Sequence, residues 1–385
     1  MSAPRLRLAL NRFRQVPVPP SLLPAAQAQA RAFHRALPGY QPTPLVPLPA
    51  LAQALGVGQV WIKDESHRFG LNAFKALGAS YAIYRFLKSR AGGAELAPAS
   101  FLSPQAMAQR PPVTFTTATD GNHGRAVAWT ASKLGQKAVI YVPRNTVKAR
   151  IDALRGEGAE VVVVDGTYDD TVRRAAADAA RHGRQVISDT AYEGYTEIPG
   201  WIMEGYGTLF EEIDEQFPAG QKPSSVFLQA GVGGLAYAGA AHYARQSVAP
   251  RLICVEPLDA DCLLESILSA NGSASMAKGK QDSIMAGLNC GTPSLLAWPL
   301  LRAAVDAFVA VDDDYARDAM RRLASLGVVS GESGAAGLAG VLALLADPAA
   351  AAQRPQLGLG PTASVLLIST EGATDPESYA RIVGR

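Results

Sequence analysis

The stretch FLQAGVGGLAYAG, residues 227–239, joins an apolar run to an alanine-rich segment through three glycines. The apolar run predicts a buried strand, and the alanine-rich segment has helical composition. Comparable apolar runs recur along the chain, and they begin at Val60, Val113, Ala138, Glu160, Gln185, Leu252, Ala307 and Val365. Apolar strands that alternate with helices predict an α/β fold, with mainly parallel sheets covered by helices on both faces.

The length and charge of the chain restrict its possible functions. A chain of 385 residues exceeds the usual size of one hydrophobic core, so we expect two packed units. Lys and Arg number 36 against 34 Asp and Glu, and neither sign forms a block. This balance gives no indication of a nucleic-acid or membrane surface and favours a small-molecule partner.

The sequence shows no clear targeting or membrane segment. The basic opening, residues 1–15, has too short an apolar run for a signal peptide, and the most apolar region, residues 335–351, is broken by Asp347 and Pro348. We therefore expect a cytoplasmic protein, with a buried helix in the apolar region.

The cysteines Cys254, Cys262 and Cys290 have neither metal-ligand spacing nor the density of a disulfide scaffold. We expect core thiols and no metal. Cys262 and Cys290 both lie in loop-like sequence and could approach each other, so a disulfide between them stays open.

The glycine loop of the opening stretch predicts an anion site. The backbone N–H groups of Gly231, Val232, Gly233 and Gly234 can converge on a phosphate at the start of the following helix. The loop also satisfies the dinucleotide pattern GxGxxA, and Glu256 ends the next strand at the distance expected for a ribose-binding acid. A dehydrogenase that uses NAD, and a glycine turn needed only for packing, are therefore alternatives.

A second loop, in TTATDGNHGRAVAW (residues 116–129), is dense in polar groups. Its candidate substrate-binding residues are Thr119, Asp120, Gly121 and His123, and the amide of Asn122 can contact an oxygen. An Asp-Gly turn with a structural histidine is the simpler alternative.

A lysine stands among apolar residues in FGLNAFKALGAS, residues 69–80. Asn72 is a good helix cap, and a helix from Ala73 would place Lys75 in its first turn. The helix dipole and the apolar surroundings both disfavour an ammonium there, so we expect a neutral, nucleophilic amine. The alternative is a lysine whose head reaches water.

Together these elements match the needs of pyridoxal phosphate: an amine for its aldehyde, a polar loop for its phenolic oxygen and a glycine loop for its phosphate. Ser369 and Thr370 end the last predicted strand. A neutral hydroxyl at the pyridine nitrogen would leave that nitrogen largely unprotonated, which favours β-elimination.

The sequence resembles the tryptophan-synthase-β-like group of pyridoxal-phosphate enzymes, also called fold type II, and within it the diaminopropionate ammonia-lyase family. The resemblance lies in KDESHRFGLNAFKALGASYA, TDGNHGRAVAW, DTAYEGYTEIPGWIMEGYGTL, QAGVGGLA, IMAGLNCG, SGESGA and ISTEGATD. These motifs extend from residue 63 to residue 375.

The resemblance implies a carbon–nitrogen lyase, a homodimer that converts 2,3-diaminopropionate to pyruvate and ammonia by α,β-elimination. It implies that Lys75 is the Schiff-base lysine, that Asn122 faces the phenolic oxygen and that Thr370 faces the pyridine nitrogen. The glycine loop would hold the phosphate. The position of Asp120 is associated with proton removal from the D isomer, and that of Asp189 with the L isomer.

The resemblance also implies a large domain, residues 1–78 and 190–385, a small α/β domain, residues 79–189, and a cofactor in the cleft between them. Dehydration of serine, threonine or a related β-hydroxy amino acid is an alternative with the same cofactor. Related dehydratases typically have a small residue where this chain has Asp120. A β-ammonium leaves as ammonia without a proton donor, so a diamino acid needs anionic surroundings and a base.

Overall fold

The computed structural model describes residues 5–24, 28–90, 97–119 and 121–384. The chain forms two compact units. The first unit comprises Met1–Ala25, Pro42–His67 and Leu209–Arg385, and the second comprises Ala26–Gln41 and Arg68–Thr208. These units and the predicted domains divide the chain at different residues, and the predicted domain boundaries stay a prediction.

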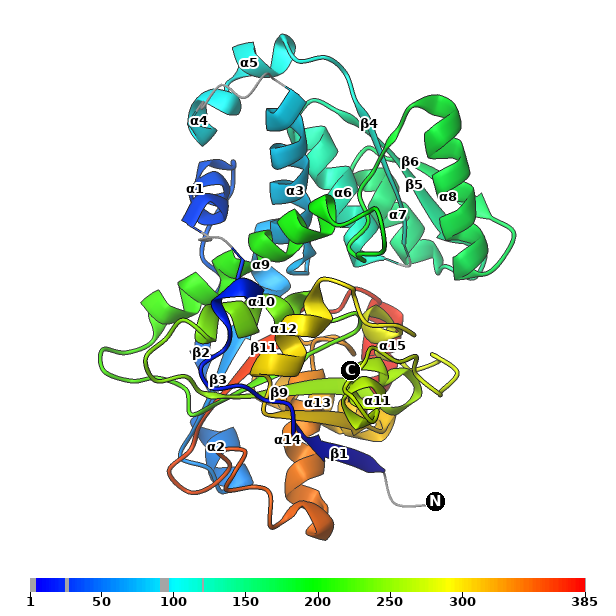
Figure 1. The fold of residues 1–385 in the computed structure, drawn as a ribbon. Coiled ribbons are helices and arrows are strands. Elements are labelled where there is room, and N and C mark those ends of the chain that lie inside the picture. Colours follow the sequence, from blue (N-terminus) through cyan, green and yellow to red (C-terminus); the bar gives the residue numbers. More distant parts are fainter. Residues whose placement is uncertain (1–4, 25–27, 91–96, 120, 385) are drawn as a thin grey trace. The chain divides into compact units, whose positions relative to one another are not determined.

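The first unit is built on a seven-stranded sheet (Figure 1). In sheet order its strands are β1 (Leu6–Leu10), β10 (Ala307–Val311), β9 (Arg251–Pro257), β8 (Ser225–Gln229), β11 (Ser364–Ser369), β3 (Gln59–Asp64) and β2 (Leu45–Pro47). The central strands are parallel to one another, whereas β1 and β2 pair antiparallel at the two edges. All carboxyl ends of the central strands therefore lie along the same edge of the sheet.

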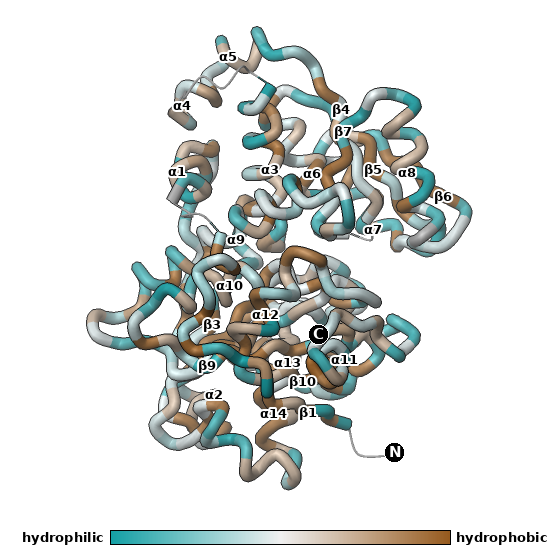
Figure 2. The backbone as a smooth tube through the Cα atoms, in the orientation of Figure 1, coloured by the Kyte–Doolittle hydropathy of each residue, from teal (hydrophilic) through white to brown (hydrophobic). Residues whose placement is uncertain are grey.

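Helices connect and cover these strands. They are α2 (Pro49–Leu55), α10 (Gly234–Tyr243), α11 (Cys262–Leu268), α12 (Ala297–Ala304), α13 (Asp313–Ser325), α14 (Ala336–Ala346) and α15 (Pro376–Val383). Helix α14 is apolar all round and packs on the sheet through β8, β9, β10 and β11 (Figure 2). Its Gly340 permits this close approach, because a Cβ there would lie 2.6 Å from Val255 Cγ2. The buried helix predicted in residues 335–351 is thus present.

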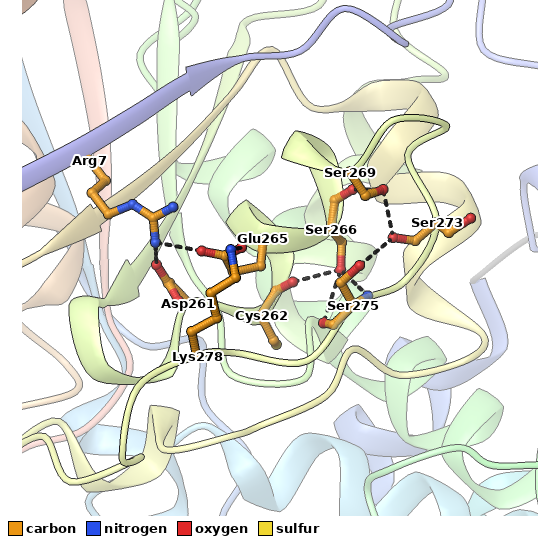
Figure 3. Close-up of polar contacts among 9 residues, drawn as sticks. All are labelled: Arg7, Asp261, Cys262, Glu265, Ser266, Ser269, Ser273, Ser275 and Lys278. Carbon is orange, nitrogen blue, oxygen red and sulfur yellow. Dashed lines mark hydrogen bonds and ion pairs between the residues drawn. The ribbon is translucent and has the colours of Figure 1, made fainter.

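The edge strand β1 is anchored by a polar cluster around α11 (Figure 3). Arg7 of β1 pairs with Asp261 and, at 2.7 Å, with Glu265, which also pairs with Lys278 at 2.6 Å. Ser266 Oγ donates to Cys262 O at 2.6 Å and accepts from the backbone N–H of Ser275. These bonds tie the strand to the helix and close the loop that follows α11.

The second unit contains a four-stranded, all-parallel sheet in the order β6-β5-β4-β7. Its strands are β4 (Thr114–Ala118), β5 (Lys137–Pro143), β6 (Glu160–Val164) and β7 (Gln185–Val186). Its helices are α1 (Ala28–Ala36), α3 (Lys75–Arg90), α4 (Pro98–Phe101), α5 (Pro104–Ala108), α6 (Asn122–Lys133), α7 (Lys148–Gly156) and α8 (Tyr168–His182). The predicted α/β class, with two mainly parallel sheets flanked by helices, is confirmed.

Helix α9 (Glu197–Gln216) begins in the second unit and ends in the first. In the second unit, α9 packs against α3 through two glycines. A Cβ on Gly78 would lie 2.5 Å from Tyr206 Cε1, and one on Gly205 would lie 2.5 Å from Leu77 O. Only glycine at these positions allows the two helices to approach so closely. In the described part of the chain, no helix is both long enough and apolar enough to cross a bilayer.

A buried ion pair fixes the carboxyl-terminal part of α9 in the first unit. Lys63 of β3 and Glu212 of α9 are both fully buried, and Lys63 Nζ lies 2.7 Å from Glu212 Oε2. The same ammonium donates to Thr43 O at 2.7 Å and to Gln216 Oε1 at 2.8 Å. Its three donors therefore have three acceptors, the arrangement that makes a buried charge tolerable.

We predict that Lys63→Met lowers the free energy of unfolding by about 3–5 kcal/mol, because it removes the cation that compensates the buried negative charge of Glu212. The measurement is urea-induced unfolding followed by circular dichroism. As a control, Lys148→Met removes an exposed cation paired with Asp152 and should cost about 1 kcal/mol or less. The double variant Lys63→Met/Glu212→Leu should recover most of the loss; a double variant as unstable as Lys63→Met would contradict the prediction.

Candidate active site

Lys75 and Asp189 meet in the second unit although 114 residues separate them in sequence. Lys75 is the first residue of α3, and Asp189 lies three residues after β7. Lys75 Nζ donates to Asp189 Oδ2 at 2.5 Å, and the two side chains are 22% and 25% exposed. The structure thus brings together an amine and a carboxylate that both remain accessible.

The surroundings of Lys75 differ from the sequence prediction in two respects. Helix α3 begins at Lys75 and not at Ala73, and Asn72, in a left-handed conformation with φ 58°, lies three residues before Lys75 and is not the N-cap. The carboxylate of Asp189 also faces the amine directly, and an opposite charge at this distance favours the ammonium. The prediction that Lys75 is neutral did not take this carboxylate into account, because Asp189 is distant from Lys75 in sequence.

Two side chains hold the segment that carries Asp189. Tyr195 Oη accepts from the backbone N–H of Ser188 at 2.9 Å and donates to Val186 O at 3.1 Å. His123 Nε2 lies 2.8 Å from Ile187 O, and because a carbonyl only accepts, Nε2 carries a proton. Three consecutive residues before Asp189 are therefore fixed by side chains from outside the segment.

Electrostatics keep Asp189 ionised. Burial alone would raise its pKa, but the charges of Lys75 and His123 outweigh burial and hold the pKa of Asp189 well below its usual range. His123 Nδ1 lies 3.9 Å from Asp189 Oδ2. His123 itself is 7% exposed and contributes to this cluster, while the predicted contact between His123 and substrate stays a prediction.

Tyr206 is a neighbour of Lys75 and was not among the predicted site residues. It is buried, its ring packs on Phe74 at 4.6 Å between centroids, and burial raises its pKa while the charge of Lys75 opposes that rise. The residue lies within the motif WIMEGYGTL, whose helical period places Ile202 and Tyr206 on one face.

The polar loop after β4 is organised by Thr119. Its Oγ1 accepts from the backbone N–H groups of Gly121 and Gly124 at 3.0 and 3.2 Å. A Cβ on Gly124 would lie 2.2 Å from Thr119 Cγ2, so this loop requires glycine there. Asn122 then begins α6. Thr119 is 2% exposed and shapes the loop, and Asp120 lies outside the described residues.

The glycine loop, residues 231–234, lies in the first unit, between β8 and α10. Gly233 has φ 100°, and a Cβ there would lie 2.7 Å from Leu301 Cδ1. No side chain caps the N-terminus of α10, so its first N–H groups remain available to an anion. This cradle fits a phosphate group.

Thr370 lies at the same edge of the sheet as the glycine loop, because β8 and β11 are parallel neighbours. It directly follows β11 and is 4% exposed. Its Oγ1 contacts Nε2 of Gln229, the last residue of β8, at 3.2 Å. The first unit thus places a hydroxyl and the glycine loop with its uncapped helix N-terminus on adjacent strand ends.

The role considered for Glu256 in binding a ribose is wrong. Glu256 is fully buried, and its two carboxylate oxygens accept from the backbone N–H groups of Leu263 and Leu264, both at 2.8 Å. Burial raises the pKa of Glu256 well above its usual value. Its oxygens accept hydrogen bonds from the first turn of α11 and are not available to a ribose. The glycine loop therefore lacks the acid that the dehydrogenase alternative requires.

Cys254, Cys262 and Cys290 form no disulfide in the structure. Cys262 Sγ donates to Gly231 O at 3.6 Å, and a Cβ on Gly231 would lie 2.7 Å from Cys290 Sγ, so both thiols flank the same glycine. Across the residues that the structure describes, no three His, Cys, Asp or Glu side chains are grouped as metal ligands.

A family model described as pyridoxal-phosphate dependent enzyme matches residues 36–357. The chain belongs to this family. The family model confirms the predicted cofactor, pyridoxal phosphate, and it agrees with the amine and the phosphate cradle seen in the two units.

Similarity to individual proteins is more specific. The chain is 42% identical to the diaminopropionate ammonia-lyase of Escherichia coli K12, over 98% of this chain and 96% of that protein. It matches the crystal structure of the Escherichia coli enzyme in complex with an aminoacrylate–pyridoxal-phosphate azomethine intermediate, with a TM-score of 0.87 and 41% identity over 99% and 97% of the two chains. The predicted resemblance and fold type are confirmed.

A dehydratase matches over a shorter part of the chain. The L-threonine dehydratase of Haemophilus influenzae is 32% identical over 58% of this chain and 37% of that protein.

We predict that Tyr195→Phe lowers activity severalfold and the free energy of unfolding by about 1–3 kcal/mol, because the Ser188 N–H and the Val186 carbonyl lose their partner. Activity assays and urea unfolding provide the two measurements. Tyr192→Phe is the matched control, because Tyr192 stacks on Tyr195 with centroids 5.0 Å apart but is 55% exposed. Equal losses in the two variants would show that the hydroxyl of Tyr195 does not hold the segment.

Proposed function

We propose that the protein is a carbon–nitrogen lyase that converts 2,3-diaminopropionate to pyruvate and ammonia by α,β-elimination. The contact between Lys75 Nζ and Asp189 Oδ2 carries the proposal, because it sets a base beside the amine that would bind the cofactor. The 42% identity to an ammonia-lyase over nearly the whole chain supports the same substrate class.

Four groups named in the sequence analysis would hold pyridoxal phosphate. Lys75 would bind its aldehyde carbon, Asn122 would contact its phenolic oxygen, and Thr370 would contact its pyridine nitrogen. The N–H groups of the glycine loop would bind its phosphate. When bound, the cofactor supplies an electron sink that acidifies the carbon bearing the substrate's α-amino group.

The chain's own residues would handle the protons. Asp189 is ionised because of its neighbours, so at neutral pH its Oδ2 is able to accept the α-proton. His123 would stabilise the carboxylate electrostatically, and Tyr195 would hold the backbone segment that carries it. The carboxylates Asp120 and Asp189 would also attract the β-ammonium of the substrate, which leaves as ammonia without a proton donor.

The dehydratase alternative rests on the shared cofactor and on the shorter match to a threonine dehydratase. A hydroxyl leaving group needs a proton from an acid. Asp189 faces the amine of Lys75 as a carboxylate and carries no proton to supply, and this favours the diamino substrate.

We also propose a cytoplasmic homodimer, from the resemblance and the balanced charge. Sedimentation of the purified enzyme should give twice the chain mass, and a monomer alone would contradict the dimer. Fractionation of the producing cells tests the location.

We predict that Lys75→Ala abolishes turnover, by about a thousandfold or more, while the fold remains intact, because the amine is the covalent anchor of the cofactor. Borohydride reduction of the wild-type holoenzyme should fix the cofactor on Lys75, as read by peptide mass. Lys75→Arg is the control that keeps a cation beside Asp189, and it should be equally inactive. Label on another lysine would contradict the assignment.

We predict that Asp120→Asn impairs turnover of D-diaminopropionate more than that of the L isomer, and that Asp189→Asn has the opposite preference. Each carboxylate would remove the proton from one isomer, so each loss should reach about a hundredfold on that isomer. Pyruvate release is measured separately on the D and L isomers, with D-serine, L-serine and L-threonine as comparison substrates. Equal losses on both isomers would refute separate roles, and faster turnover of the hydroxy amino acids would favour the dehydratase.

A further inference from the structure

Gln229 is buried at a junction of three segments of the first unit, and it is 2% exposed. Its Nε2 lies 2.7 Å from Ile368 O at the end of β11, and 3.1 and 3.2 Å from the carbonyls of Gly334 and Ser333 before α14. The same nitrogen lies 3.2 Å from Thr370 Oγ1. The side chain therefore joins the end of β8 to the loop before α14 and to the end of β11.

The three carbonyls determine how the amide of Gln229 is oriented. Carbonyl oxygens only accept, so the group that faces them must be the donor, Nε2. Exchanging nitrogen and oxygen would set Oε1 against three other oxygens. Oε1 instead points toward α14, where a Cβ on Gly337 would lie 3.6 Å from it. Oε1 is buried and has no hydrogen bond to any described residue. This orientation therefore leaves one buried acceptor unsatisfied, which is energetically unfavourable.

The orientation of Gln229 determines the hydrogen-bonding role of Thr370. An amide nitrogen has no lone pair available for a hydrogen bond, so the hydroxyl of Thr370 is unable to donate to it. This holds even though four acceptors share the two N–H groups of Nε2. Among the described residues, no hydrogen bond uses the proton of Thr370. The proton is left for a group outside the protein chain.

We propose that Gln229 is a positioning residue that makes Thr370 an obligatory hydrogen-bond donor to the pyridine nitrogen of the cofactor. This rests on the proposed function, in which Thr370 contacts that nitrogen. A pyridine nitrogen that accepts a proton from a neutral hydroxyl keeps its lone pair and stays unprotonated. The bound cofactor is then a weaker electron sink, which limits reactions that need a long-lived carbanion and favours rapid loss of the β-amine.

The test is a double-mutant cycle on Gln229 and Thr370. In Gln229→Met the amide is absent, so the carbonyls of Ser333 and Ile368 compete for the proton of Thr370 and the pyridine nitrogen loses its donor. Thr370→Val removes the donor itself. The readouts are the dissociation constant of pyridoxal phosphate from the dialysed enzyme and the ¹⁵N chemical shift of the labelled pyridine nitrogen in the holoenzyme.

Each single variant should weaken cofactor binding by about tenfold, the usual effect of one hydrogen bond, and should move the ¹⁵N signal in the same direction. The double variant should resemble Thr370→Val alone, because Gln229 acts through that hydroxyl. Losses that multiply to about a hundredfold would overturn the proposal, since Gln229 would then contribute only to structure. Thr370→Ser, which keeps the donor, should retain the wild-type shift.

If Gln229→Met does not fold, Gln229→Leu, which also removes the amide, replaces it in the cycle, and the same coupling is expected. A wild-type ¹⁵N shift in the range of a protonated pyridine would also overturn the proposal. Failure of the wild-type protein to bind the cofactor at Lys75 would instead refute the proposed function, so the two failures are distinguishable.

Discussion

The contact between the amine of Lys75 and the carboxylate of Asp189 is the interaction around which the second unit is arranged. It joins the start of a helix to the end of a short strand. Tyr195 and His123 use side-chain donors and acceptors to hold the backbone before Asp189, and Tyr206 packs beside the amine. An accessible charge pair keeps its geometry only when the surrounding groups are themselves fixed, and here backbone hydrogen bonds fix them.

The first unit positions its polar groups through the topology of its sheet. Parallel strands direct their carboxyl ends to one edge, where backbone groups lack strand partners and loops begin. Gln229 and Thr370 stand at neighbouring ends on that edge, and the glycine loop follows Gln229. A single amide thereby satisfies carbonyls of two other segments and keeps the hydroxyl of Thr370 available, so structural and chemical roles coincide in one side chain.

Much of this arrangement was predictable from local pattern, and the exceptions have physical causes. Every apolar run that predicted a strand became one, whereas β1 (LRLAL) and β2 (LVP) were missed because these two strands are short and half-exposed and have no long apolar run. Lys75 was identified from its apolar context, but its charge state depends on Asp189, which is distant in sequence. Glu256 matched a spacing rule and serves a helix terminus instead. Tyr195, Tyr206 and Gln229 act on groups from other segments, and no local pattern indicates such contacts.

Helix α9 carries two side chains with separate structural roles. Tyr206, beside the amine, and Glu212, in the buried ion pair, belong to the same helix. Each residue of an α-helix advances 1.5 Å and turns by about 100°, so inserting or deleting one residue between them would rotate Tyr206 relative to Glu212 about the helix axis by about 100°. The segment between these two residues is therefore expected to tolerate substitutions far better than insertions or deletions. The length of this part of the helix is constrained more strongly than its sequence.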